Sequence, residues 1–345
     1  MATRETQQET QIVDALLDRG RRRLLTLGGA ALAGLAVGPG LQAQAQSTTS
    51  YSDNDILNFA LNLEFLEANF YYLAAFGCTI DKPNAAAIAA GAPTTGIPIT
   101  GSAGTAGTVS GGSLVPFTTI AASAYAVETA IEEGKHVLAL QSALGSSAIA
   151  QPAINLGTAW QKLAVAAGLA NPAFTPYASD ASFLLGAFVF EDVGVSAYTG
   201  AASLLTSASN LQVAAGLLSV EAYHAGLIRT ALTVLDPTGS LGLITATGQI
   251  ATLRATLSAA AAGSTASTYD KQPDDFGLAA TNVSLAGGGS VAAARIADAD
   301  ATTSIAFARG TEQVINIVTG GGAGSGSTSP ALGLFFPAGL NGLFK

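Results

Sequence analysis

Four segments of the chain have apolar side chains at alternating spacings of three and four residues, with few helix-breaking residues: 53–76, 117–144, 178–206 and 209–234. This spacing is typical of the core-facing stripe of a helix in a packed bundle. Each stripe also carries a glutamate near its middle. Because an ionised carboxylate is costly to bury, such a bundle can form only where protons, basic side chains or metal ions compensate the glutamates.

The connections between these segments indicate how the helices are arranged. Only a few residues around Ser207 separate the last two segments, so we expect them to be antiparallel neighbours. Residues 91–113 are rich in Gly, Pro, Ser and Thr and predict a long surface loop. Residues 145–177 are long enough to run the length of the bundle, with one short helix around 160–169. The predicted fold class is all-α, a four-helix bundle with a long crossover.

Helix-capping residues mark some of the expected boundaries. Asp53, next to Ser52, is the expected N-cap of the first helix, and Gly77 is its expected C-terminal stop. Asn210 or Ser209 is expected to cap the fourth helix.

The chain has two histidines, and each follows a glutamate by three residues. The pairs are Glu133 with His136 in the second segment and Glu221 with His224 in the fourth. Side chains at positions i and i+3 share one helix face, so each pair can bind one ion. Glu132, four residues before His136, is an alternative to Glu133, although the match with the fourth segment favours Glu133.

The other two helices each have a glutamate followed seven residues later by a tyrosine: Glu64 with Tyr71, and Glu191 with Tyr198. Glu67 also faces the stripe and is an alternative to Glu64, which alone reproduces the Glu–Tyr spacing. One glutamate from each of two helices and a Glu-x-x-His from each of the others form the ligand set of carboxylate-bridged di-iron and di-manganese bundles. The predicted ligands of two divalent ions, iron or manganese, are therefore Glu64, Glu133, His136, Glu191, Glu221 and His224.

Roles follow from this ligand pattern. We expect Glu133 and Glu221 to bridge the two ions, and His136 and His224 to be terminal ligands, one for each ion. The remaining two glutamates would be terminal carboxylate ligands.

Other residues near the predicted site have expected places too. Tyr71 and Tyr198 are expected either to donate hydrogen bonds to the ligands or to be core aromatics with a satisfied hydroxyl. We expect Asp192 on a solvated helix face, Glu128 at the surface, and Cys78 as a small buried residue. With this one cysteine the chain can form neither an internal disulfide nor a cysteine-based zinc site.

The N-terminal region has the layout of an export signal. Arg21, Arg22 and Arg23 precede a weakly apolar run, and Ala43 and Ala45 offer small residues for cleavage. The consecutive arginines resemble a twin-arginine signal, which predicts a periplasmic or secreted protein. We divide the chain into a signal (1–45), a bundle (46–235) and a C-terminal extension (236–345).

The extension carries a weaker pattern. Residues 246–262 and 291–318 have helical character, 319–328 is a Gly/Ser-rich linker, and the apolar tail 331–344 is expected to dock on the bundle. We find no site chemistry in the extension.

Charge and hydropathy exclude other classes of protein. The chain has 14 basic and 23 acidic side chains, of which the signal contains five and four, so the remainder has a net charge of −10. A surface of that sign repels phosphate, which argues against a nucleic-acid partner. The mean hydropathy of +0.43 owes much to alanine, and the unbroken apolar runs are shorter than the roughly 20 residues of a transmembrane helix.

Three stretches resemble a known family. Residues 58–71 (Asn-Phe-Ala-Leu-Asn-Leu-Glu-Phe-Leu-Glu-Ala-Asn-Phe-Tyr) are similar to the first helix of bacterial ferritin-like proteins related to plant desiccation-related proteins. Residues 307–318 and 333–342 resemble the C-terminal region of that family. The resemblance covers most of the chain after the signal. It implies a ferritin-like four-helix bundle with a dinuclear metal site, and it leaves the chemistry undefined.

The sequence supports three functional hypotheses. The first is an exported metalloprotein that oxidises Fe(II) or consumes peroxide, with metal ions and peroxide or dioxygen as its partners. The second is a non-catalytic protein of desiccation or stress tolerance, in which a metal would be structural or vestigial. The third, iron storage in a cage, is weaker because a shell would have to accommodate the long loop and the extension. The sequence leaves a monomer and a homo-oligomer both open.

Overall fold

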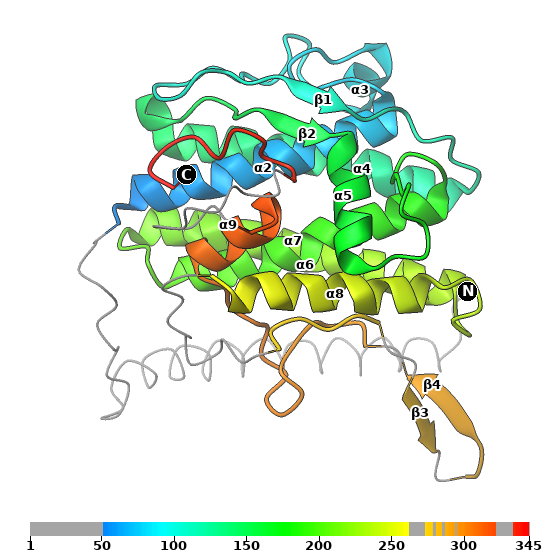
Figure 1. Cartoon of the computed structure of the whole chain (residues 1–345). Helices are drawn as coiled ribbons and strands as arrows, with labels where there is room; N and C mark the ends of the chain where they lie inside the picture. The colour runs from blue at the N-terminus through cyan, green and yellow to red at the C-terminus, as the bar shows by residue number, and fades with distance from the viewer. Residues whose placement is uncertain are drawn as a thin grey trace, which may run out of the picture. The chain divides into compact units, whose positions relative to one another are not determined.

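Four long helices form a bundle in the computed structural model: α2 (Asp53–Phe76), α4 (Ile120–Leu144), α6 (Asp180–Ala202) and α7 (Ala208–Leu235) (Figure 1). The structure describes residues 51–261, 273–278, 281–284, 287–293, 295–321 and 334–344. The predicted export signal lies outside these residues, as does most of the predicted linker. Helix α2 packs most extensively on α4, and α6 on α7. The all-α fold class is confirmed, and each bundle helix starts and ends within four residues of its predicted bounds.

Helix α2 starts one residue earlier than its expected cap implies. Ser52 is the N-cap, and its side chain and that of Asp55 each accept a hydrogen bond from the other residue's backbone N–H. This reciprocal capping box satisfies two N–H groups that the first turn would leave without partners. Gly77 ends the helix, as predicted, with a left-handed φ of 70°.

Asp53 acts instead on the start of α7. Its carboxylate accepts hydrogen bonds from the backbone N–H groups of Thr206 and Ser207, at 2.9 and 3.0 Å. Ser207 is the N-cap of α7, so the expectation of Asn210 or Ser209 was wrong by two or three residues. Asp53 thereby ties the start of α2 to the short turn that makes α6 and α7 antiparallel neighbours.

The two long connections lie alongside the bundle, next to α2 and α4 (Figure 1). The first contains α3 (Ala85–Ala90) and β1 (Val109–Gly111), which pairs in parallel with β2 (Ile154–Leu156) of the second. The second also contains a 3-10 turn, η1 (Gly145–Ser147), and α5 (Thr158–Ala167). The predicted short helix is therefore present, and the predicted loop is irregular except for the residues of β1.

The extension contributes helices α8 (Leu243–Ala259) and α9 (Thr311–Thr319), which contact each other and α6 (Figure 1). The predicted helix over 291–318 is wrong in its first part. There, β4 (Ser290–Ala293) pairs antiparallel with β3 (Thr281–Ser284) across a glycine turn. Alanine and valine alone do not separate a helix from a strand in so short a run.

The C-terminal tail docks on the body of the protein, as predicted, over its described residues 334–344. Most of its apolar side chains are buried, although Leu343 is exposed, and the Phe335 ring lies 4.9 Å from Trp160 and 4.8 Å from Phe190, measured between ring centroids. Backbone hydrogen bonds from Leu334 and Phe335 to the end of α9 fix the tail in place.

Helices α6 and α7 are long and apolar enough to cross a membrane by length and composition. In α6, 83% of the most apolar stretch is buried inside the protein, and in α7 the share is 33%. Core helices of bundles also pass such a test, so these two helices do not show a membrane span.

Candidate metal centre

All four bundle helices bring acidic or imidazole side chains to one level in the core. Because α6 and α7 leave the same short turn, residues about four turns from it on either helix lie at the same depth. The side chains that meet there are all buried: Glu64 from α2, Glu133 and His136 from α4, Glu191 from α6, and Glu221 and His224 from α7.

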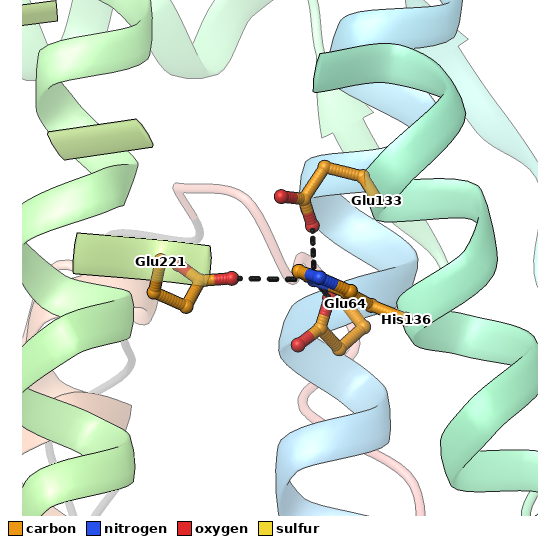
Figure 2. A group of neighbouring side chains, drawn as sticks. All are labelled: Glu64, Glu133, His136 and Glu221. Carbon is orange, nitrogen blue, oxygen red and sulfur yellow. Dashed lines mark ion pairs between the residues drawn. The ribbon is translucent and has the colours of Figure 1, made fainter. Parts of the chain in front are cut away.

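Three carboxylates surround His136, as Figure 2 shows. The His136 Nδ1 atom lies 3.3 Å from Glu64 Oε2 and 3.4 Å from Glu133 Oε2. It also lies 3.5 Å from Glu221 Oε1. One ligand atom from each of these four side chains lies within 4.8 Å of the others, which is compact enough to surround one ion. We call this set the His136 group.

A second set of side chains lies beside the first. The His224 Nδ1 atom is 2.9 Å from Glu133 Oε1 and 3.5 Å from Glu191 Oε2. We call these three residues the His224 group. Glu133 belongs to both groups, with one oxygen directed to each histidine, as expected of a bridging carboxylate. Glu221 belongs to the His136 group alone, so the structure does not reproduce the bridging arrangement expected for it.

The inward atoms of both groups lack hydrogen-bond partners. Eight buried atoms are affected: Glu64 Oε2, both oxygens of Glu133, His136 Nδ1, Glu191 Oε2, both oxygens of Glu221, and His224 Nδ1. Each such buried polar atom costs roughly 1–3 kcal/mol unless something binds it. No arginine or lysine among the described residues forms an ion pair with these glutamates. Oxygen and imidazole donors around a shared carboxylate therefore fit divalent cations.

The pKa values reflect crowded like charge. Burial, together with Glu133, raises the pKa of Glu64 to about 7, although His136 acts against this shift. Burial and Glu133 also raise the pKa of Glu221 well above its ordinary value. Burial opposes ionisation of Glu133 itself, but the flanking histidines outweigh it and lower its pKa. Without ions the cluster thus holds protons, which ion binding must displace.

Two tyrosines connect α2 and α6 crosswise. The Tyr71 hydroxyl of α2 donates to Glu191 Oε1 of α6, and the Tyr198 hydroxyl of α6 donates to Glu64 Oε1 of α2. Each hydroxyl satisfies one oxygen of its glutamate and leaves the other, Oε2, facing a histidine. Two roles were expected for these tyrosines, and the structure shows the first, a hydrogen bond from each hydroxyl to a candidate ligand.

The structure also separates the alternatives that the sequence left open. Glu132 lies in neither group, because its Oε2 contacts the outer nitrogen of His224, Nε2, at 2.8 Å. Glu67 is buried but also lies outside both groups. Burial and the neighbouring Glu221 raise the pKa of Glu67 well above its ordinary value, which favours its neutral form. Glu64 and Glu133 are the members of these pairs that join the groups.

Asp192 was expected on a solvated face, and this was wrong. Its carboxylate is buried and accepts hydrogen bonds from Arg229 at 2.8 Å and Arg254 at 3.0 Å. Arg254 also binds Asp275, which in turn binds Arg309. These partners come from α7 and from the extension, where we had expected no site chemistry. The one available signal was the rarity of charged residues in so apolar a chain.

Two smaller expectations concern Glu128 and Cys78. Glu128 is exposed, as expected. Cys78 is only half-buried, because it follows the end of α2 in a turn.

Sequence reasoning also missed Gly194 on α6. A Cβ atom at this position would lie 2.2 Å from Glu221 Oε2, closer than non-bonded atoms approach. The absence of a side chain at Gly194 therefore leaves room for the Glu221 carboxylate. No spacing rule marks such a residue, because its role depends on a neighbouring helix.

Known proteins are similar to the bundle part of the chain. A family model described as "Ferritin-like domain" matches residues 52–234. The desiccation-related protein PCC13-62 of Craterostigma plantagineum is 35% identical over 186 residues, which cover 52% of this chain and 53% of that protein. The ferritin-like catalase Nec2 of Nesocodon mauritianus is 27% identical over 181 residues, 52% of each chain. The chain thus spans about half the length of these relatives. No solved structure matches it significantly.

Proposed function

Because this chain belongs to the ferritin-like domain family, we propose that it is a metalloprotein whose bundle binds two divalent ions, of iron or manganese. The His136 group would hold one ion and the His224 group the other, with Glu133 between them. The observation that carries the proposal is the set of eight buried, inward atoms without hydrogen-bond partners. Buried polar atoms in folded proteins nearly always have a partner, and two added cations would give one to all eight atoms at once.

We propose peroxide consumption as the reaction of this site. One peroxide would be reduced to water and a second oxidised to dioxygen, so electrons and atoms balance without another reactant. The bound ions would supply the reversible exchange of electrons with peroxide. A relative of this chain is named a ferritin-like catalase, which supports peroxide over Fe(II) oxidation as the reaction to test first.

The chain itself supplies orientation and exclusion of bulk water. Tyr71 and Tyr198 hold the outer oxygens of Glu191 and Glu64, so that the inner oxygens stay directed to the ions. Burial of both groups removes competing water and strengthens each contact between an ion and a carboxylate.

A second candidate is a non-catalytic role in desiccation or stress tolerance, in which the ions stabilise the bundle. It is favoured by the 35% identity to a protein named desiccation-related. In that case ions would raise the unfolding temperature, and the loaded protein would not decompose peroxide.

The experiment is metal analysis followed by peroxide-decomposition and Fe(II)-oxidation assays on protein loaded with iron or manganese. We expect about two ions per chain. Glu133→Ala and His136→Ala should lose most of the metal and the activity, whereas Glu128→Ala, an exposed glutamate on the same helix, should lose neither. Wild-type protein that never binds these metals stoichiometrically would refute the proposal.

We propose in addition that the protein is exported by the twin-arginine route. The proposal rests on Arg21, Arg22 and Arg23 with the apolar run that follows them. Replacing all three arginines by lysine should retain the precursor in the cytoplasm. Unchanged export of that variant would refute the route.

A further inference from the structure

The two halves of the site differ in their surroundings. On the side of α6, helices α8 and α9 cover the bundle, and on the side of α2 and α4 the connection containing α3 does so. Between α4 and α7, in contrast, a groove of about 670 Å³ is lined by residues that include Tyr125, Ala222 and Tyr223. Tyr223 is 76% exposed and directly precedes His224. The groove therefore lies beside the stretch of α7 that carries His224, although no residue of the His224 group lines it.

Glu132 lies on this side of the site. Its side chain is 38% exposed, whereas that of His224 is only 5% exposed. Glu132 Oε2 contacts His224 Nε2 at 2.8 Å, while His224 Nδ1 faces Glu133 and Glu191 inside the bundle. The imidazole ring thus separates a carboxylate that reaches solvent from the buried cluster.

His136 has no equivalent of Glu132 among the described residues. The ion pairs of His136 all involve Nδ1 and the carboxylates of its own group. The His136 group also offers four side chains to an ion, and the His224 group three. The two halves therefore differ both in ligand number and in what holds the histidine.

We propose that Glu132 is a positioning residue that holds His224 from its outer nitrogen, on the side where cations enter and leave the site. This inference rests on the proposed metal site and goes beyond it by assigning an exchangeable half. An ionised carboxylate can only accept a hydrogen bond, so Glu132 keeps a proton on Nε2 and directs the lone pair of Nδ1 to the ion. Its partly exposed negative charge also attracts cations to this side of the site.

Cobalt(II) is a suitable probe, because its visible absorption reports the ligands around it. Wild-type protein loaded with Co²⁺ and mixed with excess EDTA should release its ions in two phases. The faster phase is that of the His224 group, and Glu191→Gln, which removes a ligand from this group alone, should abolish it.

The test variant is Glu132→Gln, which keeps an acceptor atom and removes the charge. We expect it to lower the affinity for the faster-released ion by about 10–100-fold and to change the absorption bands of that ion, with the slower phase unchanged. Glu132→Ala, which also removes the acceptor, should have a larger effect. The matched control is Glu128→Gln, an exposed glutamate one turn earlier on α4, which should leave both phases unchanged.

The possible results separate the two proposals. If the Glu132→Gln variant releases its Co²⁺ ions at the same rates as wild type, the role of Glu132 is overturned and the proposed metal site is left intact. An equal acceleration of both phases, with a lower unfolding temperature of the ion-free variant, would show a merely structural role and would also overturn it. Wild-type protein that binds no metal would refute the proposed function, and this inference with it.

Discussion

Gly194→Ala is the most direct test of how α6 and α7 share space at the site. A Cβ atom at position 194 would lie 2.2 Å from Glu221 Oε2 and 3.0 Å from Glu221 Cδ. Since the nearest atoms belong to the end of a flexible side chain, the glutamate can move while the helices stay in place. The substitution should therefore displace the Glu221 carboxylate from the His136 group.

Two opposing terms set the size of the effect in the ion-free protein. Alanine is favoured over glycine inside a helix by about 0.5–1 kcal/mol. Added volume in a packed core costs about 1–3 kcal/mol, and rotation of Glu221 holds this cost near the lower end. The two terms nearly cancel, so the ion-free variant should unfold within about 1 kcal/mol of wild type. In the ion-bound protein, rotation of Glu221 does not avoid the cost, because the rotated glutamate no longer reaches the ion.

We expect the ion in the His136 group to bind about 10–100-fold more weakly, which is about 1.4–2.7 kcal/mol. Thermal unfolding with and without Mn²⁺ measures both quantities on the same samples. Gly216→Ala on α7 is the matched control, since a Cβ atom there meets nothing within 4 Å. It should gain helix stability and keep both ions. Identical ion binding and unfolding in the two variants would refute the proposed contact between Gly194 and Glu221.

Further predictions concern the surroundings of the site. Tyr71→Phe and Tyr198→Phe each leave a buried carboxylate oxygen without its hydrogen-bond donor. Each variant should therefore lose roughly 1–3 kcal/mol of unfolding free energy, measured in urea, and bind one of the two ions more weakly. Equal loss of both ions in either variant would contradict this. Glu67→Gln should retain two ions by metal analysis, because this buried acid lies outside both groups, and loss of an ion would make it a ligand. Chelation should lower the free energy of unfolding by about 2.7 kcal/mol for each ion, relative to protein at 100-fold excess of ion over its Kd, and calorimetry that finds no shift would contradict bound structural ions. Arg309→Met should lower the free energy of unfolding by about 3–5 kcal/mol, since it leaves Asp275 with one fewer partner, and a neutral result in urea would show that the aspartate relaxes.

The arrangement of the bundle could be predicted because it depends on local spacing. Alternation of three and four residues fixes which face of each helix is buried, and a short turn at Ser207 fixes the depth at which Glu191 and Glu221 meet. The capping of that turn could not be predicted. It depends on Asp53, which lies 154 residues from Ser207 in the sequence and reaches it only in the folded protein.

The choice between neighbouring glutamates was harder for a similar reason. Glu132 and Glu133 differ by one helical step, about 100° of rotation, and both can approach a histidine. The sequence favours Glu133 by analogy with α7, but it cannot show that Glu132 reaches the outer nitrogen of His224 on another helix. Asp192 was misplaced because its partners, Arg229 and Arg254, lie 37 and 62 residues away in the sequence.

Two buried ionic clusters lie side by side in this fold, and they differ in how far the chain's own cations compensate their carboxylates. Asp192 follows Glu191 directly, yet its carboxylate is paired with Arg229 and Arg254, so its charge is compensated within the chain. Glu191 has a tyrosine donor and one shared histidine, and its inner oxygen has no hydrogen-bond partner. Burial and acidity alone would count Asp192, with Asp275 and Asp298, as a third candidate ion group. The arginines argue against that reading, because a permanent cation already occupies the place that a metal ion would take. What distinguishes the candidate metal centre is therefore its large surplus of carboxylates over cationic partners, which among the described residues lies where α2, α4, α6 and α7 meet.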